Sequence, residues 1–387
     1  MKIAFLASRF PYPLDKGDKV RAYHQIKHLS KKHSVYLICL SDGDIAPGHL
    51  AHLQSFCADI KIYPISKPGI GLGMAGALFS GLPFQVGYFY RSDIKKRIIA
   101  DLDAIKPDAI VCQLLRMAEY VKDYQHPNKV LDYMDVFSAD MLRRKQVSSG
   151  IEKIVFGAEN TRVLKYEQEV FPYFQKHTII SGQDRDLLPI KDSKSVEVIP
   201  NGIDFDYQHT ARPEKHYDIL FFGNMGYTSN IESAVFLAQQ VVPLLVKQFP
   251  NIKVLIAGAE PHKRVLALQS NHVEISGWID DKWACYASAR IFAAPMLISV
   301  GMQNKILEAM AVNVPCVVTS MANNAIGADN GKEILVANTP EDFAAAIAQL
   351  LNNEDFASQM AANAHSFITK NYVWAETVER LEHYILK

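Results

Sequence analysis

Short apolar runs rich in β-branched residues alternate along the whole chain with amphipathic segments of helical length. In the first half these runs are 2–7, 35–40, 60–65, 109–114, 129–134 and 178–181. In the second half they are 196–199, 218–223, 253–258, 273–277, 291–295, 314–319 and 334–337. Runs that are apolar on both alternating faces are typical of parallel strands covered by helices on each side. The pattern predicts an α/β protein with two open, doubly wound sheets rather than one closed barrel.

The length of 387 residues is too great for one ordinary core and fits two domains. The polar stretch 184–194 separates the two series of strands. We therefore expect an N-terminal domain over 1–188 and a C-terminal domain over 189–366. Residues 367–387 form a further amphipathic segment with Trp374 near its middle, which predicts a terminal helix.

Composition narrows the class of protein. The chain is 49% apolar and 21% charged, as globular domains are, and no run of about 18 residues is apolar without polar or Gly breaks. The apolar run at the start is too short for a signal peptide and is better explained as a buried strand. The five cysteines are odd in number and lack metal-ligand spacing. We expect reduced thiols and a cytoplasmic protein.

Charge is distributed unevenly, although the net charge is zero. Residues 1–100 carry 14 Lys and Arg against 6 Asp and Glu, so the remainder carries 27 against 35. Within this basic part, 67–90 is apolar and rich in Gly, and Arg91, Lys95, Lys96 and Arg97 follow it. Such a segment is typical of peripheral contact with an anionic membrane, although a core-packing loop and helix would have the same composition.

Two loops that follow predicted strands offer ligand contacts, because ligands of open parallel sheets bind at the strands' carboxyl ends. The first is 9–21, where Gly17 permits close approach of the backbone. It lacks the GxGxxG pattern, so a dinucleotide site is poorly supported and a plain turn remains the alternative. The second is FFGNMGYTSN over 221–230, where Gly223 and Asn224 could bind a phosphate through N–H groups. That loop contains no cation.

The third loop, after 291–295, is the most informative. Gly301 allows close approach of the backbone, and Gln303, Asn304 and Lys305 open a predicted helix. The helix dipole adds about half a positive charge at that start, and Lys305 adds a full one. Glu308 follows one turn later on the same face. These residues predict a diphosphate at the helix start and a sugar ring against the carboxylate. An exposed Lys–Glu pair is the alternative.

Four motifs resemble retaining glycosyltransferases of the GT-B fold, family four, of the type found in bacterial exopolysaccharide clusters. They are VIPNGID (198–204), FFGNMGYTSN (221–230), ISGWIDD (275–281) and NKILEAMAVNVPCVVT (304–319). The resemblance covers nearly the whole chain. It implies two Rossmann-like domains that face each other across a cleft, and a C-terminal helix that crosses back to the N-terminal domain.

The resemblance also implies roles for individual residues. Glu308 would bind the ribose hydroxyls of a nucleotide-sugar donor, and the N–H groups of Asn304 and Lys305 would face its diphosphate. The turn of Gly277, Trp278 and Ile279 would lie against the base. The loop around Gly17 would close over the phosphates and the acceptor.

The sequence departs from the family at two positions. Val300 stands where a second Glu usually contacts the sugar, and Asn224 stands in a loop that usually carries Arg and Lys. Lys305 and the basic residues Arg9, Lys16 and Lys19 could compensate. Four polar residues are expected at the edge of the first domain's sheet: Asp132, Asp135, Gln113 and Arg116. Of these, we prefer Asp135 as the contact to sugar or acceptor. The alternative is an N-cap, since a carboxylate after a strand often has only that role.

Together these features predict transfer of a hexose-type sugar from a nucleoside diphosphate to a glycan or lipid-linked acceptor, with retention. Lys305, Glu308 and Asp135 are the predicted catalytic residues. We expect no cofactor besides the donor, no metal, because DxD, HxH and HExxH patterns are missing, and no nucleic acid. Two alternatives remain: a nucleotide-sugar epimerase of the same architecture, and a non-catalytic subunit that binds nucleotide or glycan and supports a partner transferase.

Overall fold

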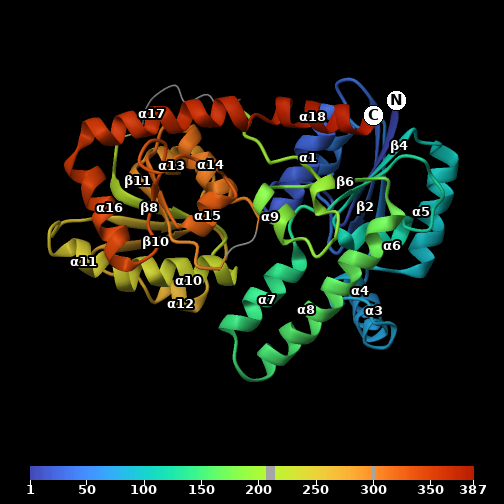
Figure 1. Ribbon diagram of the computed structural model, residues 1–387, viewed down its shortest axis with the longest axis horizontal. Helices are drawn as coiled ribbons and strands as arrows, with labels where there is room; N and C mark the ends of the chain where they lie inside the picture. Colours follow the sequence, from blue (N-terminus) through green and yellow to red (C-terminus); the bar gives the residue numbers. More distant parts are fainter. Residues whose placement is uncertain (206–213, 299–300) are drawn as a thin grey trace. The chain divides into compact units, whose positions relative to one another are not determined.

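A computed structural model describes residues 1–205, 214–298 and 301–387 (Figure 1). The chain divides into two compact units. The first unit comprises Met1–Asn201 and Trp374–Lys387, and the second comprises Gly202–Val373.

The first unit is built on a parallel sheet of seven strands, with the order β3-β2-β1-β4-β5-β6-β7 among its residues. The strands are β1 (Lys2–Ala7), β2 (Ser34–Ser41), β3 (Asp59–Pro64), β4 (Ala109–Gln113), β5 (Lys129–Asp132), β6 (Lys176–Ile179) and β7 (Glu197–Val198). In β1, which lies between β2 and β4, Ile3 pairs with Val35 on one side and Ala109 on the other. All registers are parallel, so the carboxyl ends of the strands meet at one edge of the sheet.

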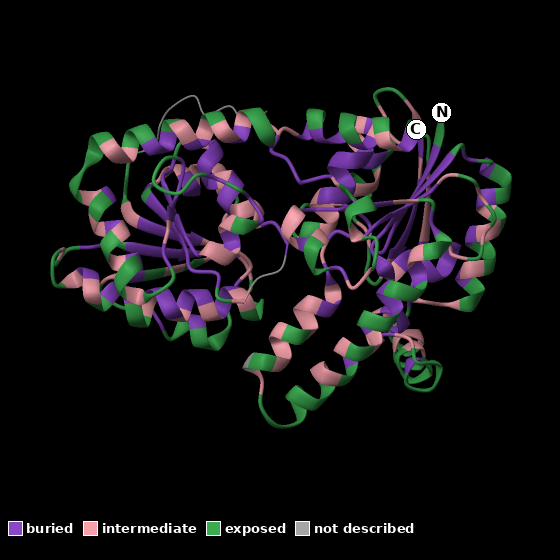
Figure 2. Ribbon diagram, in the orientation of Figure 1, coloured by how far each residue is buried: buried purple, intermediate pink, exposed green. Residues whose placement is uncertain are grey.

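Helices cover both faces of this sheet, although α3 lies almost entirely outside the core. The helices of the first unit are α1 (Gly17–Leu29), α2 (Pro47–Gln54), α3 (Lys67–Ser80), α4 (Phe84–Phe89), α5 (Ser92–Ile105), α6 (Leu115–Val121), α7 (Phe137–Val147), α8 (Gly150–Val170), α9 (Gly182–Leu187) and α18 (Trp374–Leu386), with short 3₁₀ turns at Phe171–Tyr173 and Ser193–Ser195. Alternate residues of β1 enter two separate cores, as the pleat requires: Ile3 and Phe5 face α1 and α18, whereas Ala4 and Leu6 face α5, α6 and α8. Figure 2 shows the strands as the buried layer.

The C-terminal segment belongs to both units. The predicted helix over 367–387 is interrupted: α17 (Glu354–Asn371) ends in the second unit, and α18 packs on α1 in the first. The Trp374 ring is buried and stacks on His24 with 4.7 Å between ring centroids. Residues 189–201, which we assigned to the C-terminal domain, lie in the first unit, because β7 pairs with β6.

The second unit contains a parallel sheet whose described strands have the order β10-β9-β8-β11-β12-β13. The strands are β8 (Tyr217–Phe222), β9 (Val254–Ala257), β10 (Val273–Gly277), β11 (Ala289–Ala294), β12 (Cys316–Val318) and β13 (Leu335–Val336). Its helices are α10 (Thr228–Phe236), a π-helical turn (Leu237–Val241), α11 (Val242–Val246), α12 (Lys263–Leu266), α13 (Lys282–Ala287), α14 (Asn304–Ala311), α15 (Ser320–Asn324), α16 (Pro340–Asn352) and α17.

One helical stretch among the described residues, Thr228–Val246, is long and apolar enough to cross a membrane by length and composition alone. Half of its most apolar window is buried inside the protein. Core helices of water-soluble domains meet the same criterion, so this stretch is weak support for a membrane span.

Candidate functional site

Glycines end three neighbouring strands of the second sheet and let the loops at its carboxyl edge approach closely. The amide of Gly223 donates to the carbonyl of Ala257 at 3.0 Å, and the amide of Gly258 donates to the carbonyl of Gly277 at 2.9 Å. Gly258 has a φ of 130°, and a Cβ there would lie 1.8 Å from the Gly223 carbonyl oxygen. Only glycine satisfies both constraints. The surface at the carboxyl ends of β8, β9 and β10, called the glycine floor below, is therefore formed by the backbone of Gly223, Gly258 and Gly277.

Lys305, in the first turn of α14, projects its amine towards this floor. The Lys305 Nζ donates to Asn230 Oδ1 and lies 5.1 Å from the centroid of the Phe221 ring. A Cβ at Gly223 would be 3.0 Å from the same nitrogen. Burial lowers the pKa of Lys305 to about 7, and the nearby Glu308 only partly opposes that shift. In the described part of the chain, this amine has no carboxylate ion-pair partner.

Glu308, one turn further along α14, is held by α13. Its Oε1 accepts a hydrogen bond from Lys282 Nζ at 2.6 Å, and its Oε2 accepts one from Tyr286 OH at 2.9 Å. Burial and then the Glu308 charge raise the pKa of the Tyr286 phenol well above its ordinary value. The sequence analysis missed Lys282 and Tyr286. The available signal was their spacing: Asp281 is a typical N-cap, so Lys282 and Tyr286, four residues apart, are expected on one face of the helix that follows.

The predicted base-contacting turn is largely open to solvent. Gly277 has a φ of 72°, and the side chain of Trp278 is 67% exposed. The Trp278 indole donates to Asp280 Oδ1 at 2.8 Å, whereas Ile279 is half-buried. An exposed aromatic ring fixed by one hydrogen bond can stack on a planar ligand.

The loop after β8 is neutral, as its sequence indicated, and it faces a carboxylate. Asn224 Nδ2 donates to Glu260 Oε2 at 3.0 Å, and Asn224 Oδ1 accepts from the Gly226 amide at 2.8 Å. Asn230 Nδ2 donates to the Asn224 carbonyl at 2.8 Å. Sequence analysis missed Glu260 because it follows a different strand. Lys305 of α14 brings a cation to this loop through its hydrogen bond to Asn230.

The remaining predicted residues of this site flank α14. Gly301 has a φ of 71°, which turns the chain towards the helix, and Gln303 and Asn304 at the helix start are half-buried. Val300, the position of the missing family Glu, lies outside the described residues.

In the first unit, Asp132 has a structural role. Arg21 binds it through two hydrogen bonds, Nε to Oδ2 at 2.6 Å and Nη2 to Oδ1 at 2.9 Å, and both side chains are buried. Thr178 Oγ1 donates to the same Oδ1 at 2.9 Å. The other guanidinium nitrogen of Arg21 donates to Asn201 and to the Ile199 carbonyl. Because its oxygens are taken up by this network, Asp132 does not contact solvent at the edge of the sheet.

Asp135 behaves differently. Its carboxyl is half-buried near Asp184, and burial followed by repulsion from Asp184 raises the pKa of Asp135 to about 8. A carboxyl that holds its proton near neutral pH can donate as well as accept hydrogen bonds.

A basic cluster lies at the start of α1. Arg9 Nη1 and Arg116 Nη1 lie 2.5 and 3.7 Å from Asp18 Oδ2, and Gln113 Nε2 donates to the Asp18 carbonyl at 2.9 Å. Burial raises the pKa of Asp18, but the two guanidinium groups outweigh it and leave that pKa below its ordinary value. Gly17, the residue before Asp18, has open space where a side chain would be.

The structure thus brings Lys305, Gly223 and Asn224 together through Asn230, and places Glu308 on the side of α14 that faces α13. Asp135 and Gly17 belong to the first unit.

Comparison with known proteins shows what the chain and its second unit are similar to. Residues 216–353 match the family model described as Glycosyl transferases group 1. An uncharacterized 44.6 kDa protein in the cps region of Klebsiella pneumoniae is 26% identical over 393 residues, covering 96% of each chain. Sucrose-phosphate synthase from Thermosynechococcus elongatus has a TM-score of 0.71 at 16% identity, and the superposition covers 99% of this chain and 98% of the synthase chain. Anabaena Alr3699/HepE in complex with UDP and glucose has a TM-score of 0.70 at 14% identity, with the same coverage.

The family match lies within the second unit, where the Lys305 site is found, and the structural likeness spans the chain. Together they show a two-domain GT-B fold, with a second unit that is similar to Glycosyl transferases group 1.

Proposed function

We propose that the protein transfers a sugar, with retention of the anomeric configuration, from a nucleoside-diphosphate donor to a glycan or lipid-linked acceptor. The observation that carries this proposal is the Lys305 amine, a cation for which residues 1–205, 214–298 and 301–387 provide no carboxylate ion-pair partner, at the start of α14 beside Gly223. Helix dipole, backbone N–H groups and a cation are the combination that binds phosphate. That Alr3699/HepE was solved with UDP supports a nucleotide at a fold of this kind.

In this proposal α14 binds the donor along its length. The N–H groups of Asn304 and Lys305 and the Lys305 amine hold the diphosphate, and Glu308 accepts hydrogen bonds from the ribose hydroxyls. The exposed Trp278 in the turn after β10 lies against the base. Glu308 is already fixed by Tyr286, so its carboxylate is oriented before the donor arrives.

The chemical step needs no nucleophile from the protein. The bond between the anomeric carbon and the diphosphate oxygen breaks, and the acceptor oxygen bonds to that carbon on the same face. The acceptor's proton passes to the departing diphosphate oxygen. Negative charge develops on the diphosphate, where Lys305 and the α14 dipole stabilise it, so we propose a reaction without a metal ion. Asp135 is proposed as a polar contact to sugar or acceptor.

A donor screen tests the proposal. Thermal shift with UDP, GDP and ADP sugars should identify one base, because a ligand at a hundred times its Kd stabilises by about 2.7 kcal/mol. Lys305→Ala should abolish that shift, and Lys263→Ala on α12 should leave it intact. An unchanged kcat/KM in Lys305→Ala would contradict the role of this residue. The anomeric configuration of the product, read by NMR coupling constants, tests retention.

A non-catalytic binding subunit is the second candidate, and the neutral loop beside Glu260 favours it. A carboxylate 3.0 Å from the Asn224 amide weakens the positive potential that a diphosphate needs. Nucleotide binding without donor hydrolysis or transfer over an acceptor panel would favour this alternative.

The biological setting is proposed from the relative in the Klebsiella pneumoniae cps region, which points to exopolysaccharide or cell-surface glycan synthesis. We propose a cytoplasmic enzyme that meets its acceptor at the inner face of the plasma membrane. Accumulation of a shortened glycan intermediate in a deletion strain would test this setting.

A further inference from the structure

Helix α3 is apolar but almost entirely outside the core. After Lys67 the helix contains no charged residue, and of its residues Lys67–Ser80 only Ala77 is buried. Leu72 is 76% exposed and Phe79 is 91% exposed, with Met74 and Leu78 beside them. Figure 2 shows α3 as largely exposed. Exposed apolar side chains gathered on one helix mark an interaction surface, since single ones are ordinary.

The inner side of α3 is anchored by small residues and one arginine. A Cβ at Gly73 would lie 2.2 Å from the carbonyl oxygen of Gly87, so α3 and α4 touch backbone to backbone. Arg162 of α8 donates to the carbonyl of Ala77 at 2.9 Å. The helix is therefore held along one side, and its apolar residues are presented outward.

The start of α8 carries a second exposed apolar stripe. Ile151 is 78% exposed, Ile154 is 71% exposed, and Val155 is also exposed. Their i, i+3, i+4 spacing places them on one helical face. Because α3 follows β3 and the α7–α8 hairpin follows β5 in one parallel sheet, both leave the sheet at its carboxyl edge (Figure 1).

Positive charge accompanies both stripes. Residues 66–91 contain Lys67 and Arg91 and not a single Asp or Glu. Residues 137–165 contain six Lys and Arg against three Asp and Glu. Apolar side chains flanked by cations match a bilayer with anionic headgroups.

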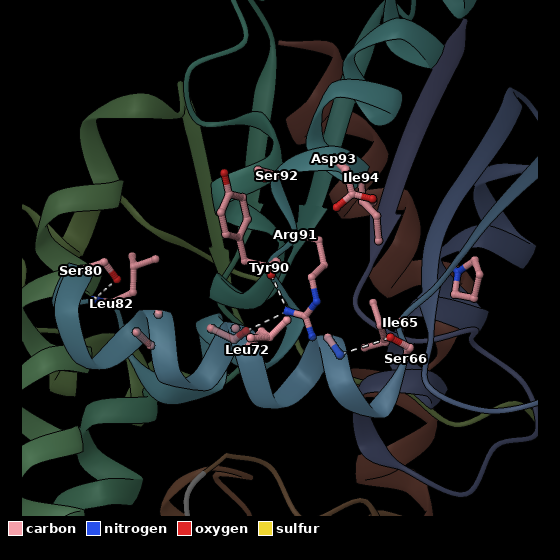
Figure 3. Close-up of a pocket in the computed structure, with 16 residues that line it drawn as sticks. Ile65, Ser66, Leu72, Ser80, Leu82, Tyr90, Arg91, Ser92, Asp93 and Ile94 are labelled. Atoms are coloured by element: carbon pink, nitrogen blue, oxygen red, sulfur yellow. Dashed lines mark hydrogen bonds between the residues drawn. The ribbon is translucent and has the colours of Figure 1, made fainter.

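A cavity of about 590 Å³ beside α3 contains the Arg91 side chain. Figure 3 shows that side chain directed towards α3. Arg91 Nη1 donates to the Gly87 carbonyl and Nη2 to the Tyr88 carbonyl, each at 3.1 Å. Among the described residues no carboxylate forms an ion pair with this guanidinium, although Asp93 also lines the cavity and partly opposes the lowering of the Arg91 pKa by burial. The cavity thus places a guanidinium that no carboxylate binds directly at the base of the apolar helix.

We propose that α3 and the first turns of α8 form a docking surface for an anionic lipid bilayer. The exposed residues Leu72, Phe79, Ile151 and Ile154 enter the interface, Lys67 and Lys153 contact headgroups, and the cavity at Arg91 accepts a headgroup phosphate. The helices that form this surface follow strands at the carboxyl edge of the sheet, and Asp135 lies at the same edge. A lipid-linked acceptor would therefore reach that edge from the membrane. This inference concerns binding to lipid and holds whether or not the chain transfers sugar.

Vesicle co-sedimentation of the full chain, without donor or acceptor, tests the surface. The vesicles contain phosphatidylglycerol and phosphatidylcholine in equal parts, or phosphatidylcholine alone. Leu72→Glu with Phe79→Glu should weaken binding to the anionic vesicles by at least about tenfold. The matched control, Leu266→Glu with Leu386→Glu, replaces two leucines exposed elsewhere and should bind as the unmodified protein does.

Charge is tested separately. Lys67→Gln and Lys153→Gln should each weaken binding about fivefold at low salt. Equal binding to both kinds of vesicle, or loss of binding in the control pair, would overturn the proposal. Light scattering gives the remaining outcome: a dimer that Phe79→Glu dissociates, together with no vesicle binding, would show that the surface contacts a second copy and would also overturn it.

Discussion

The Lys305 amine should make donor binding depend on pH in a direction that can be worked out in advance. The Lys305 side chain is half-buried at the start of α14, and burial lowers the pKa of its amine to about 7. The ordinary lysine pKa is about 10.4. A bound diphosphate places two negative charges against the amine and favours its protonated form. Donor binding above pH 7 must therefore take up a proton.

The size of the effect follows from the two pKa values. If the donor returns the Lys305 pKa to its ordinary range, the donor-bound amine stays charged throughout the range from pH 6 to 8. In the free protein, about nine in ten amines are protonated at pH 6 and about one in ten at pH 8. Donor affinity should consequently fall about tenfold between these two values, which corresponds to about 1.4 kcal/mol.

Isothermal titration calorimetry measures both quantities. An intact nucleotide sugar is preferable to the free diphosphate, because a terminal phosphate itself titrates near pH 6. Repeating the titration at pH 8 in buffers of different ionisation enthalpy should give close to one proton taken up per donor bound. Lys305→Arg is the matched control, because a guanidinium remains protonated throughout this range and should give a nearly flat profile.

Two results would refute this reasoning. A donor Kd that is the same at pH 6 and pH 8 would show that Lys305 does not lose its proton in the free protein. The same slope in Lys305→Arg would assign the dependence to another group, of which Asp135, with a pKa of about 8, is the first to examine.

Three further predictions concern neighbouring features. Asp132→Asn should lower the free energy of unfolding by about 3–5 kcal/mol in urea titrations, because it leaves a buried guanidinium without its counter-charge; a loss below 1 kcal/mol would contradict that. Gly258→Ala should cost about 3 kcal/mol or more, since φ is positive and the new methyl meets backbone, and a wild-type Tm would exclude the close approach. Tyr286→Phe should raise the donor Kd about tenfold, whereas Lys282→Ala should change it less than threefold; the reverse order would show that Lys282 positions Glu308.

The fold could be predicted because its signals are local. The predicted runs 2–7, 109–114 and 291–295 correspond to the buried strands β1, β4 and β11, since both faces of a parallel sheet must be apolar. The extent of the first unit was harder to predict. β7 has two residues, and its place beside β6 depends on a pairing between segments separated in the sequence. The interruption at Tyr372 likewise left no strong local signal, because the residues around it are compatible with a helix.

The sequence predicted that Lys305 and Glu308 lie in the first turns of one helix, and α14 contains both. It did not predict that their side chains have different neighbours: Lys305 reaches Asn230, and Glu308 is held by α13. The partners of these residues come from other segments. Glu260 approaches Asn224 from the end of β9, and Arg21 reaches Asp132 across 111 residues of sequence. Such contacts depend on strand order, which periodicity does not encode.

Under the proposed function, Glu308 must receive a donor although its carboxylate already has two partners. Lys282 is 40% exposed, and its ion pair with Glu308 is one that water and salt weaken, so exchanging the ammonium for ribose hydroxyls costs less than about 1 kcal/mol. Tyr286 is buried, and its hydroxyl would lose its acceptor if the carboxylate turned away. In the proposed donor complex the two partners would therefore have different roles: Tyr286 would hold the carboxylate in place, and Lys282 would give up its oxygen to the donor. Released from Glu308, the Lys282 ammonium would remain beside α14. There it adds positive charge to a site whose loop after β8 provides none.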